Sequence, residues 1–88
     1  MSYRLLNLAC GSKISNHGNW VNVDFKSPNP NVRECNILDG LGYRSQYFDV
    51  VYSSQFIEHL SYCVAQKVLE DLAKILKKGG FIRLVTPD

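Results

Sequence analysis

The sequence predicts an α/β fold in which a parallel sheet is wound by helical and loop crossovers. Three observations indicate it: short apolar segments recur along the 88-residue chain, loop-like or helical segments separate them, and one long amphipathic helix precedes the last apolar segment. Parallel strands joined by right-handed crossovers leave few topologies. We therefore predict a single domain over residues 1–88, with a doubly wound sheet in the strand order 3-2-1-4-5.

The first half of the chain supplies three of the expected strands. Residues 4–9 form an apolar run around Asn7 and are expected to be a strand buried on both faces. Residues 10–19 have loop composition and are too few for a full crossover helix. Residues 20–24 form the second strand, and the short, polar segment 32–35 is expected to be a third strand at the sheet edge.

The second half begins with the clearest strand, at residues 48–53, where β-branched and aromatic residues dominate. Ser53 and Ser54 are expected to cap a short helical piece over residues 55–60. A long helix is expected to start near Ser61, because apolar residues then recur at the three- and four-residue spacing of a core-facing stripe. The stripe consists of Ala65, Val68, Leu69, Leu72, Ile75 and Leu76.

The last part of the chain is expected to end this helix and add one strand. Glu70 and Lys74 lie one turn apart and are expected to pair on the outer face of the helix. The pair Gly79 and Gly80 is expected to end the helix in a left-handed cap. Residues 81–85 then form the last strand, and residues 86–88 stop it.

Composition and charge exclude several classes of protein. A net charge of +2 from scattered basic residues does not indicate nucleic-acid binding. No apolar run approaches the roughly 20 residues of a membrane span, and residues 1–4 lead into a strand without a leader peptide. The spacing of Cys10, Cys35 and Cys63 fits no paired-cysteine motif and no metal site with the histidines. We therefore expect a reduced, cytoplasmic protein without a bound metal.

A glycine turn after the first strand and an acid at the end of the second predict a site for a nucleoside cofactor. Gly11 lets a ligand lie close to the backbone, and the Asp24 carboxylate can accept hydrogen bonds from two ribose hydroxyls. A parallel sheet brings both strand ends to one edge, where α/β proteins bind such ligands. The alternatives are a simple turn glycine and a solvated acid.

No residue is assigned as catalytic. Histidine titrates near neutrality, so His59 is a candidate general base. His59 and Glu58 lie just before the expected long helix, however, where local packing or capping is the simpler interpretation. Asp49 lies at the start of its strand, away from the ligand edge, and is interpreted as structural.

Six segments, taken together, resemble class I S-adenosylmethionine-dependent methyltransferases, and most closely the small enzymes of the methyltransferase type 11 kind. These segments are residues 6–11, 20–24, 36–39, 48–54, 58–60 and 75–85. The resemblance implies a Rossmann-like fold, S-adenosylmethionine as the cofactor, and transfer of a methyl group to an acceptor that the sequence does not identify.

The resemblance also implies roles for the ends of the first two strands. Gly11, with the backbone of Ala9 and Cys10, would approach the methionine part of the cofactor. Asp24 would hold the ribose hydroxyls.

Four further residues receive roles in the same way. Asp39 would accept a hydrogen bond from the adenine amino group, with Leu38 against the ring. A turn at the Asp-Gly pair is the alternative role of Asp39. Ser53 and Ser54, at the end of the fourth strand, would line the other side of the cofactor.

The chain departs from the family at three places. Ala9 and Lys13 replace glycines that usually flank Gly11, Gln55 stands where relatives often carry histidine, and the last two strands of the family are absent after Asp88. A second interpretation therefore stays open, namely a non-catalytic truncated module that completes a partner or forms a homo-oligomer through the exposed sheet edge. A dinucleotide oxidoreductase is the weaker third alternative, because the turn lacks the GxGxxG pattern.

Overall fold

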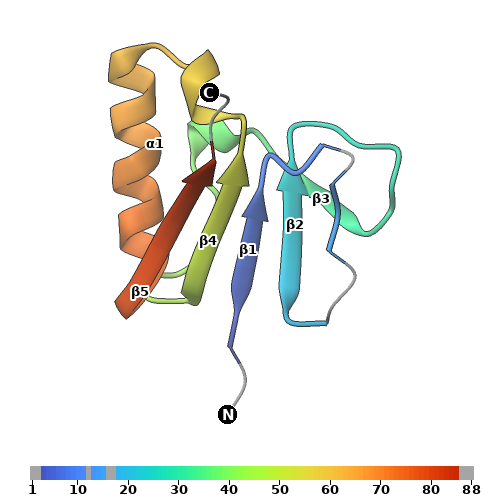
Figure 1. Ribbon diagram of the computed structural model, residues 1–88, viewed down its shortest axis with the longest axis horizontal. Coiled ribbons are helices and arrows are strands. Elements are labelled where there is room, and N and C mark those ends of the chain that lie inside the picture. Colours follow the sequence, from blue (N-terminus) through green and yellow to red (C-terminus); the bar gives the residue numbers. More distant parts are fainter. Residues whose placement is uncertain (1–2, 12, 16–17, 86–88) are drawn as a thin grey trace.

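Five parallel strands form one sheet in the order β3-β2-β1-β4-β5, which confirms the predicted Rossmann-like topology (Figure 1). The structure is a computed structural model and describes residues 3–11, 13–15 and 18–85. The elements in chain order are β1 (Leu5–Leu8), β2 (Trp20–Asp24), β3 (Val32–Glu34), the 3₁₀ turn η1 (Ile37–Asp39), β4 (Phe48–Ser54), the 3₁₀ turn η2 (Ile57–His59), α1 (Tyr62–Ile75) and β5 (Leu76–Val85).

The hydrophobic core lies between the sheet and α1. Successive side chains of a strand point to opposite faces, and in β1 the fully buried Leu6 and Leu8 belong to the core cluster. From α1 the stripe residues Val68, Leu72 and Ile75 are buried in the same cluster, as the helical spacing predicts. The apolar pattern of the sequence therefore positions α1 on this face of the sheet.

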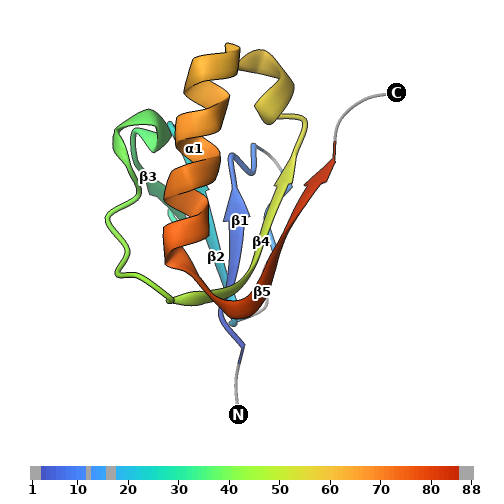
Figure 2. The same ribbon diagram turned by 90° about the vertical axis from the view of Figure 1, so that its left-hand side faces the viewer.

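The opposite face of the sheet is polar at its centre. Asn7 is aligned with Asn22 on one side and with Tyr52 on the other, so the three form one row across the sheet. Figure 2 shows α1 on one side of the sheet, and the described part of the chain places no α-helix on the other side. There, residues 13–15 lie against the sheet in place of a helix.

The junction of α1 and β5 differs from the sequence prediction. The helix ends at Ile75, and the strand begins at Leu76, so the predicted left-handed cap at Gly79 and Gly80 is wrong. The last helical carbonyls need no such cap, because the backbone N–H groups of residues 46 and 47 donate to the carbonyls of Lys74 and Ile75. Gly79, at φ +85°, instead lies where the β4–β5 register is irregular.

The predicted cap of the short helical piece after β4 is also wrong. Ser53 and Ser54 do not cap the helical piece after β4, since Phe56 is the N-cap of η2 and makes no side-chain cap hydrogen bond. Ser61 does cap α1, and its hydroxyl accepts from the Val64 amide at 3.4 Å.

The expected pair of Glu70 with Lys74 is absent from the described residues, where the ion pair is Lys77–Asp49 at 3.4 Å. Residues 86–88, which were expected to stop the last strand, lie outside the described ranges. No helix within those ranges is both long enough and apolar enough to cross a membrane.

Candidate functional site

Gly11 and Asp24 meet at the carboxyl edge of the sheet, where the strand arrows of Figure 1 point. The Gly11 backbone N–H donates to Asp24 Oδ2 at 2.9 Å, and the Phe25 N–H donates to Oδ1 at 2.8 Å. The pairing of β1 with β2 brings the glycine turn and the acid together, although thirteen residues separate them in sequence. The structure thus places these two predicted residues at one point.

The Asp24 carboxylate keeps capacity for a ligand. An ionised carboxylate offers about four lone-pair positions, and the two backbone N–H groups occupy one position on each oxygen. The side chain is only half-buried, so the remaining positions face accessible space. A ligand with hydroxyl groups on two adjacent carbons can donate one hydrogen bond to each oxygen of this carboxylate.

The backbone beside Asp24 is open and strained. Gly11 has φ +56°, and a Cβ built on it would meet no heavy atom within 4 Å, so the space next to this backbone is empty. Ala9 at φ +54° and Gln55 at φ +56° also adopt the left-handed conformation, which L side chains disfavour. Such strain is concentrated at functional sites. Ala9 and Gln55 directly follow the adjacent strands β1 and β4, whereas Gln46, also at φ +56°, lies in the turn before β4 and outside this edge.

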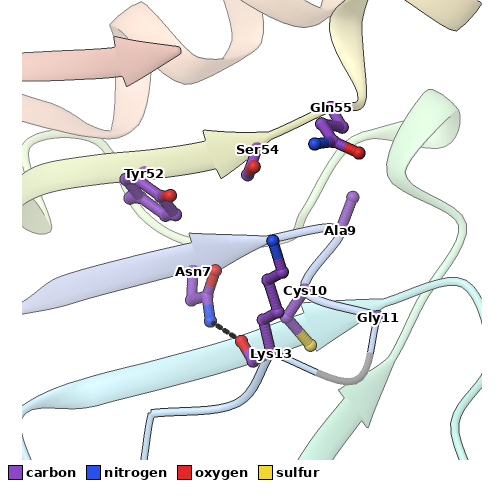
Figure 3. Close-up of a pocket in the computed structure, with 8 residues that line it drawn as sticks. All are labelled: Asn7, Ala9, Cys10, Gly11, Lys13, Tyr52, Ser54 and Gln55. Carbon is purple, nitrogen blue, oxygen red and sulfur yellow. Dashed lines mark hydrogen bonds between the residues drawn. The ribbon is translucent and has the colours of Figure 1, made fainter. Parts of the chain in front are cut away.

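A cavity of about 260 Å³ opens beside this turn (Figure 3). Its walls come from β1, the glycine turn and the end of β4, and they combine backbone with amide, hydroxyl and ammonium groups. The lining residues are Asn7, Ala9, Cys10, Gly11, Lys13, Tyr52, Ser54 and Gln55.

Two buried asparagines hold the loop that carries Lys13 against the sheet. The Asn7 side-chain amide donates to the Lys13 carbonyl at 2.9 Å and to Asn22 Oδ1 at 3.0 Å. The Asn22 side chain in turn accepts from the Ser15 N–H at 3.1 Å and donates to the Ser15 carbonyl at 2.8 Å. These two polar residues inside apolar strands therefore position the loop, and Asn7 also lines the cavity.

Of the predicted site residues, the structure brings five together. Ala9, Cys10, Gly11 and Ser54 line the cavity, and Asp24 contacts the same turn. Their proximity follows from the alignment of β1 with both β2 and β4.

Three other predicted residues lie elsewhere. Ser53 is 2% exposed, and its hydroxyl donates to the Leu8 carbonyl at 3.1 Å, so its side chain points into the sheet and not into the cavity. Leu38 and Asp39 lie on η1, outside the cavity lining. Asp39 is exposed and accepts from the Asn36 side-chain amide at 2.9 Å.

Cys10 lines the cavity but is poorly suited to act as a nucleophile. Burial raises the pKa of its thiol above the usual value, and the nearby Asp24 carboxylate raises the pKa further. The reactive form of cysteine is the thiolate, so Cys10 serves as a small wall residue at neutral pH.

His59 and Glu58 are exposed on η2 and do not line the cavity, so the structure adds no support for either as a base. Within the described ranges, no three His, Cys, Asp or Glu side chains gather in a way that could hold a metal ion.

The sequence interpretation missed an aromatic pair that spans the same edge. Phe25 follows Asp24 directly and is 42% exposed, and its ring centroid lies 6.0 Å from that of Phe56, which follows β4. The sequence could have indicated this pair, because each phenylalanine lies one or two residues after the end of a strand. Tyr52 and Gln55 were not assigned to the site from sequence, and the cavity lining is what places both beside the turn.

Comparisons with known proteins give a family match and a similar solved structure. Residues 7–84 match the model of a family described as a methyltransferase domain. The comparison with curated proteins gives no match. Among solved structures, the chain is similar to one in the complex between the Haloferax volcanii Trm112 methyltransferase activator and a candidate methyltransferase. That match has a TM-score of 0.67 at 19% sequence identity, so it shows a common fold. It covers 90% of this chain but 42% of the other chain, so this chain spans well under half of its neighbour's length.

Proposed function

The chain belongs to the methyltransferase domain family, and from that premise we propose that residues 1–88 form one domain that binds S-adenosylmethionine and transfers its methyl group. The observation that carries the proposal is the 2.9 Å hydrogen bond from the Gly11 amide to Asp24. It joins an open backbone turn to a carboxylate that has two acceptor positions left.

The ribose of the cofactor is assigned to Asp24. Each of its oxygens is already fixed by one backbone N–H, which holds the carboxylate in a single orientation. Hydrogen bonds to a charged acceptor are stronger than neutral ones. A preoriented carboxylate therefore suits the two ribose hydroxyls.

The methionine part of the cofactor is assigned to the cavity beside Gly11. The empty space where a Cβ would stand lets a ligand contact the backbone of the turn. Lys13 lines the same cavity and supplies a cation for the methionine carboxylate. Ala9, Cys10 and Ser54 complete the wall, whereas the buried Ser53 does not line the cavity.

The adenine is assigned to η1. One oxygen of the exposed Asp39 carboxylate accepts from Asn36, and the other is left for the adenine amino group. Leu38 packs on the core cluster and offers an apolar contact for the ring. Phe25 presents an exposed aromatic ring next to Asp24 and is a second candidate contact.

Bound S-adenosylmethionine supplies a methyl carbon activated by its sulfonium group. The residues of this chain then have to hold the cofactor, align the acceptor and exclude water. Tyr52 and Gln55 line the cavity on the β4 side and are assigned to the acceptor. No general base is assigned, because a base is needed only where the acceptor has to lose a proton, and the acceptor is not identified.

Isothermal titration calorimetry tests the proposal directly. The folded protein is titrated with S-adenosylmethionine, with its demethylated product and with reduced nicotinamide cofactor. We expect saturable heat from the first two ligands and none from the third. A folded sample that binds neither adenosyl compound would overturn the proposal, and binding of the nicotinamide cofactor would favour an oxidoreductase.

One observation favours a second role, self-association through β5. This strand ends the sheet order, so its outer edge has no neighbouring strand in the described part of the chain. Phe81 and Leu84 on it are 57% and 38% exposed. Such an edge is a template for pairing with another chain. Light scattering should then give a mass that rises with protein concentration, and Phe81→Lys should lower that mass. A constant monomer mass would contradict this role.

The three cysteines are all free, which supports a reducing compartment such as the cytoplasm.

A further inference from the structure

Three arginines stack on two tyrosines along the segment that joins η1 to β4. The guanidinium carbons of Arg4 and Arg44 lie 4.5 and 5.4 Å from the Tyr47 ring centroid, and that of Arg33 lies 4.7 Å from the Tyr43 centroid. Figure 2 shows this segment, in light green, running beside α1 from η1 to the start of β4. The arginines come from three separate parts of the chain, and the fold brings them together.

The cluster is anchored to the core. The two tyrosine rings stack at 5.6 Å with 18° between their planes, and the fully buried Phe48 contacts both rings edge-on at 4.9 and 5.0 Å. Energetically significant cation–π contacts occur about once per 70–80 residues, whereas three occur here in one group. The aromatic rings under the guanidinium groups are therefore fixed against the core before any ligand binds.

Within the described ranges, no side-chain ion pair joins Arg4, Arg33 or Arg44 to an acid. Arg4, Arg33 and Arg44 are exposed, and the ion pair found there joins Lys77 and Asp49 instead. Asp49 accepts from the Arg4 backbone N–H and from Lys77, and the nearby Arg4 charge also lowers the pKa of Asp49, so this carboxylate offsets part of the charge of Arg4 but not that of Arg33 or Arg44.

The other acid near the cluster is Asp71. It lines a neighbouring cavity with Tyr43 and with the exposed Lys74, whose charge opposes its own. Lys77 and Lys78 border the next cavity together with Lys74. The whole flank is therefore basic, although the chain as a whole carries a charge of only +2.

We propose that Arg4, Arg33 and Arg44 form a binding surface for the phosphate backbone of a nucleic-acid strand. A guanidinium fork matches a phosphate bidentately and keeps its charge at any physiological pH. Because the tyrosine rings are occupied by arginines and by each other, bases do not stack there. The surface therefore binds without base preference.

The cluster is compact enough for one strand of nucleic acid to contact more than one of its arginines. The separation of the Arg4 and Arg33 guanidinium groups is limited by three successive centre-to-centre distances of 4.5, 5.6 and 4.7 Å. The two groups therefore lie no more than about 15 Å apart, a length that a few nucleotides span at the duplex rise of about 3.4 Å per nucleotide.

Fluorescence anisotropy on the full chain tests the proposal. The probe is a labelled oligouridylate of about 16 nucleotides, titrated between about 50 and 200 mM salt. Replacing Arg33 and Arg44 together by Gln should weaken binding by about tenfold or more. It should also lower the salt slope by roughly 1.4, since each lost phosphate contact removes about 0.7.

A matched double variant, Lys26→Gln with Arg83→Gln, removes the same charge at exposed positions outside the cluster. It should leave the affinity within about threefold and the slope unchanged. An equal loss of affinity in the two double variants would overturn the proposal, and so would the absence of RNA binding by the wild type at low salt. Tighter binding of polyglutamate than of RNA would also overturn it and would indicate an acidic protein partner.

Two further variants keep the test decisive. If the glutamine double variant fails to fold, the single Arg44→Glu at an exposed position takes its place, and unchanged RNA affinity would then refute the surface. Asp24→Ala should retain RNA binding, so a failure of the cofactor proposal is distinguishable from a failure of this one.

Discussion

The backbone amide of Gly11 is bound to the carboxylate of Asp24 across 2.9 Å, so the acid that would hold a ligand also shapes the turn that would cradle it. Because the Phe25 N–H fixes the other oxygen, the carboxylate cannot rotate freely. A change at Asp24 therefore affects the ligand contact and the loop together.

The first prediction concerns this acid. Asp24→Ala should abolish S-adenosylmethionine binding in calorimetry. Asp24→Asn should weaken binding by at least about tenfold, because each hydrogen bond to a charged group contributes about 1.5–3 kcal/mol. Glu70→Gln, which removes an exposed carboxylate on α1, is the control and should bind as the wild type does. Equal affinity of Asp24→Asn and the control would place the ribose elsewhere.

The second prediction concerns the strained alanine. Ala9 has φ +54°, a conformation that glycine adopts at no steric cost. Ala9→Gly should therefore raise the free energy of unfolding, by about 1 kcal/mol. Ala65 lies within α1, where the same substitution should lower stability by about 1 kcal/mol. Urea denaturation measures both, and a loss of stability in Ala9→Gly would show that its methyl group packs usefully.

The strand order could be predicted because it depends on patterns that are local in sequence. The apolar segments and the composition of their connections define the order of elements, and the handedness of crossovers then restricts their arrangement. The end of α1 could not be predicted in the same way. Its last carbonyls are satisfied by residues 46 and 47, and no local pattern in either segment reveals that contact.

The same distinction between local patterns and long-range contacts applies to the residues of the candidate site. Gly11 and Asp24 could be found because Gly11 lies in the turn that follows β1 and Asp24 ends β2. The burial of Ser53 and the arginine cluster could not be found, since each depends on contacts between residues far apart in sequence. Alternation along β4 was the one available hint, because Ser53 follows the buried Val51 by two residues and faces the same side.

The third prediction concerns the buried asparagine pair. Asn22→Ala removes both contacts of the Ser15 backbone with Asn22 and leaves the Asn7 side chain with its bond to the Lys13 carbonyl alone. Unfolding stability should fall by about 1–3 kcal/mol. The loop should also loosen, so trypsin should cleave after Lys13 faster than in the wild type. Asn19→Ala, at an exposed position next to β2, is the control, and equal cleavage rates in the two variants would contradict the assigned role.

The fourth prediction concerns the close approach of β5 to β4. A Cβ on Gly80 would lie 2.6 Å from the Asp49 carbonyl oxygen and 3.0 Å from that of Lys77, and both are backbone atoms that cannot move aside. Gly80→Ala should therefore destabilise the fold by about 1–3 kcal/mol. At Gly18 a Cβ meets nothing within 4 Å, so Gly18→Ala should be nearly neutral. Equal melting temperatures for the two variants would refute this close packing.

The fifth prediction concerns pH. The Arg4 backbone N–H donates to Asp49 at 2.8 Å and is the main reason that the pKa of this carboxyl lies below its usual value of 3.8, with a further contribution from Lys77. A carboxyl whose pKa is lower in the folded state stabilises the fold above the unfolded-state pKa and loses that effect as the pH falls through the folded-state value. The stability difference between the wild type and Asp49→Asn should therefore be constant from about pH 5 to 8 and shrink below 3.8.

Lys77→Met separates the two causes of this pH dependence. It removes the 3.4 Å ion pair but leaves the Arg4 amide in place. Because the amide has the larger effect on the pKa of Asp49, most of the acid-induced loss of stability should remain in Lys77→Met. Chemical denaturation at a series of pH values measures it. If Lys77→Met lost no stability at acid pH, the Lys77–Asp49 ion pair would be the dominant contact of Asp49. The main role of Asp49 would then be to connect β4 with β5, and its bond to the Arg4 backbone would be secondary.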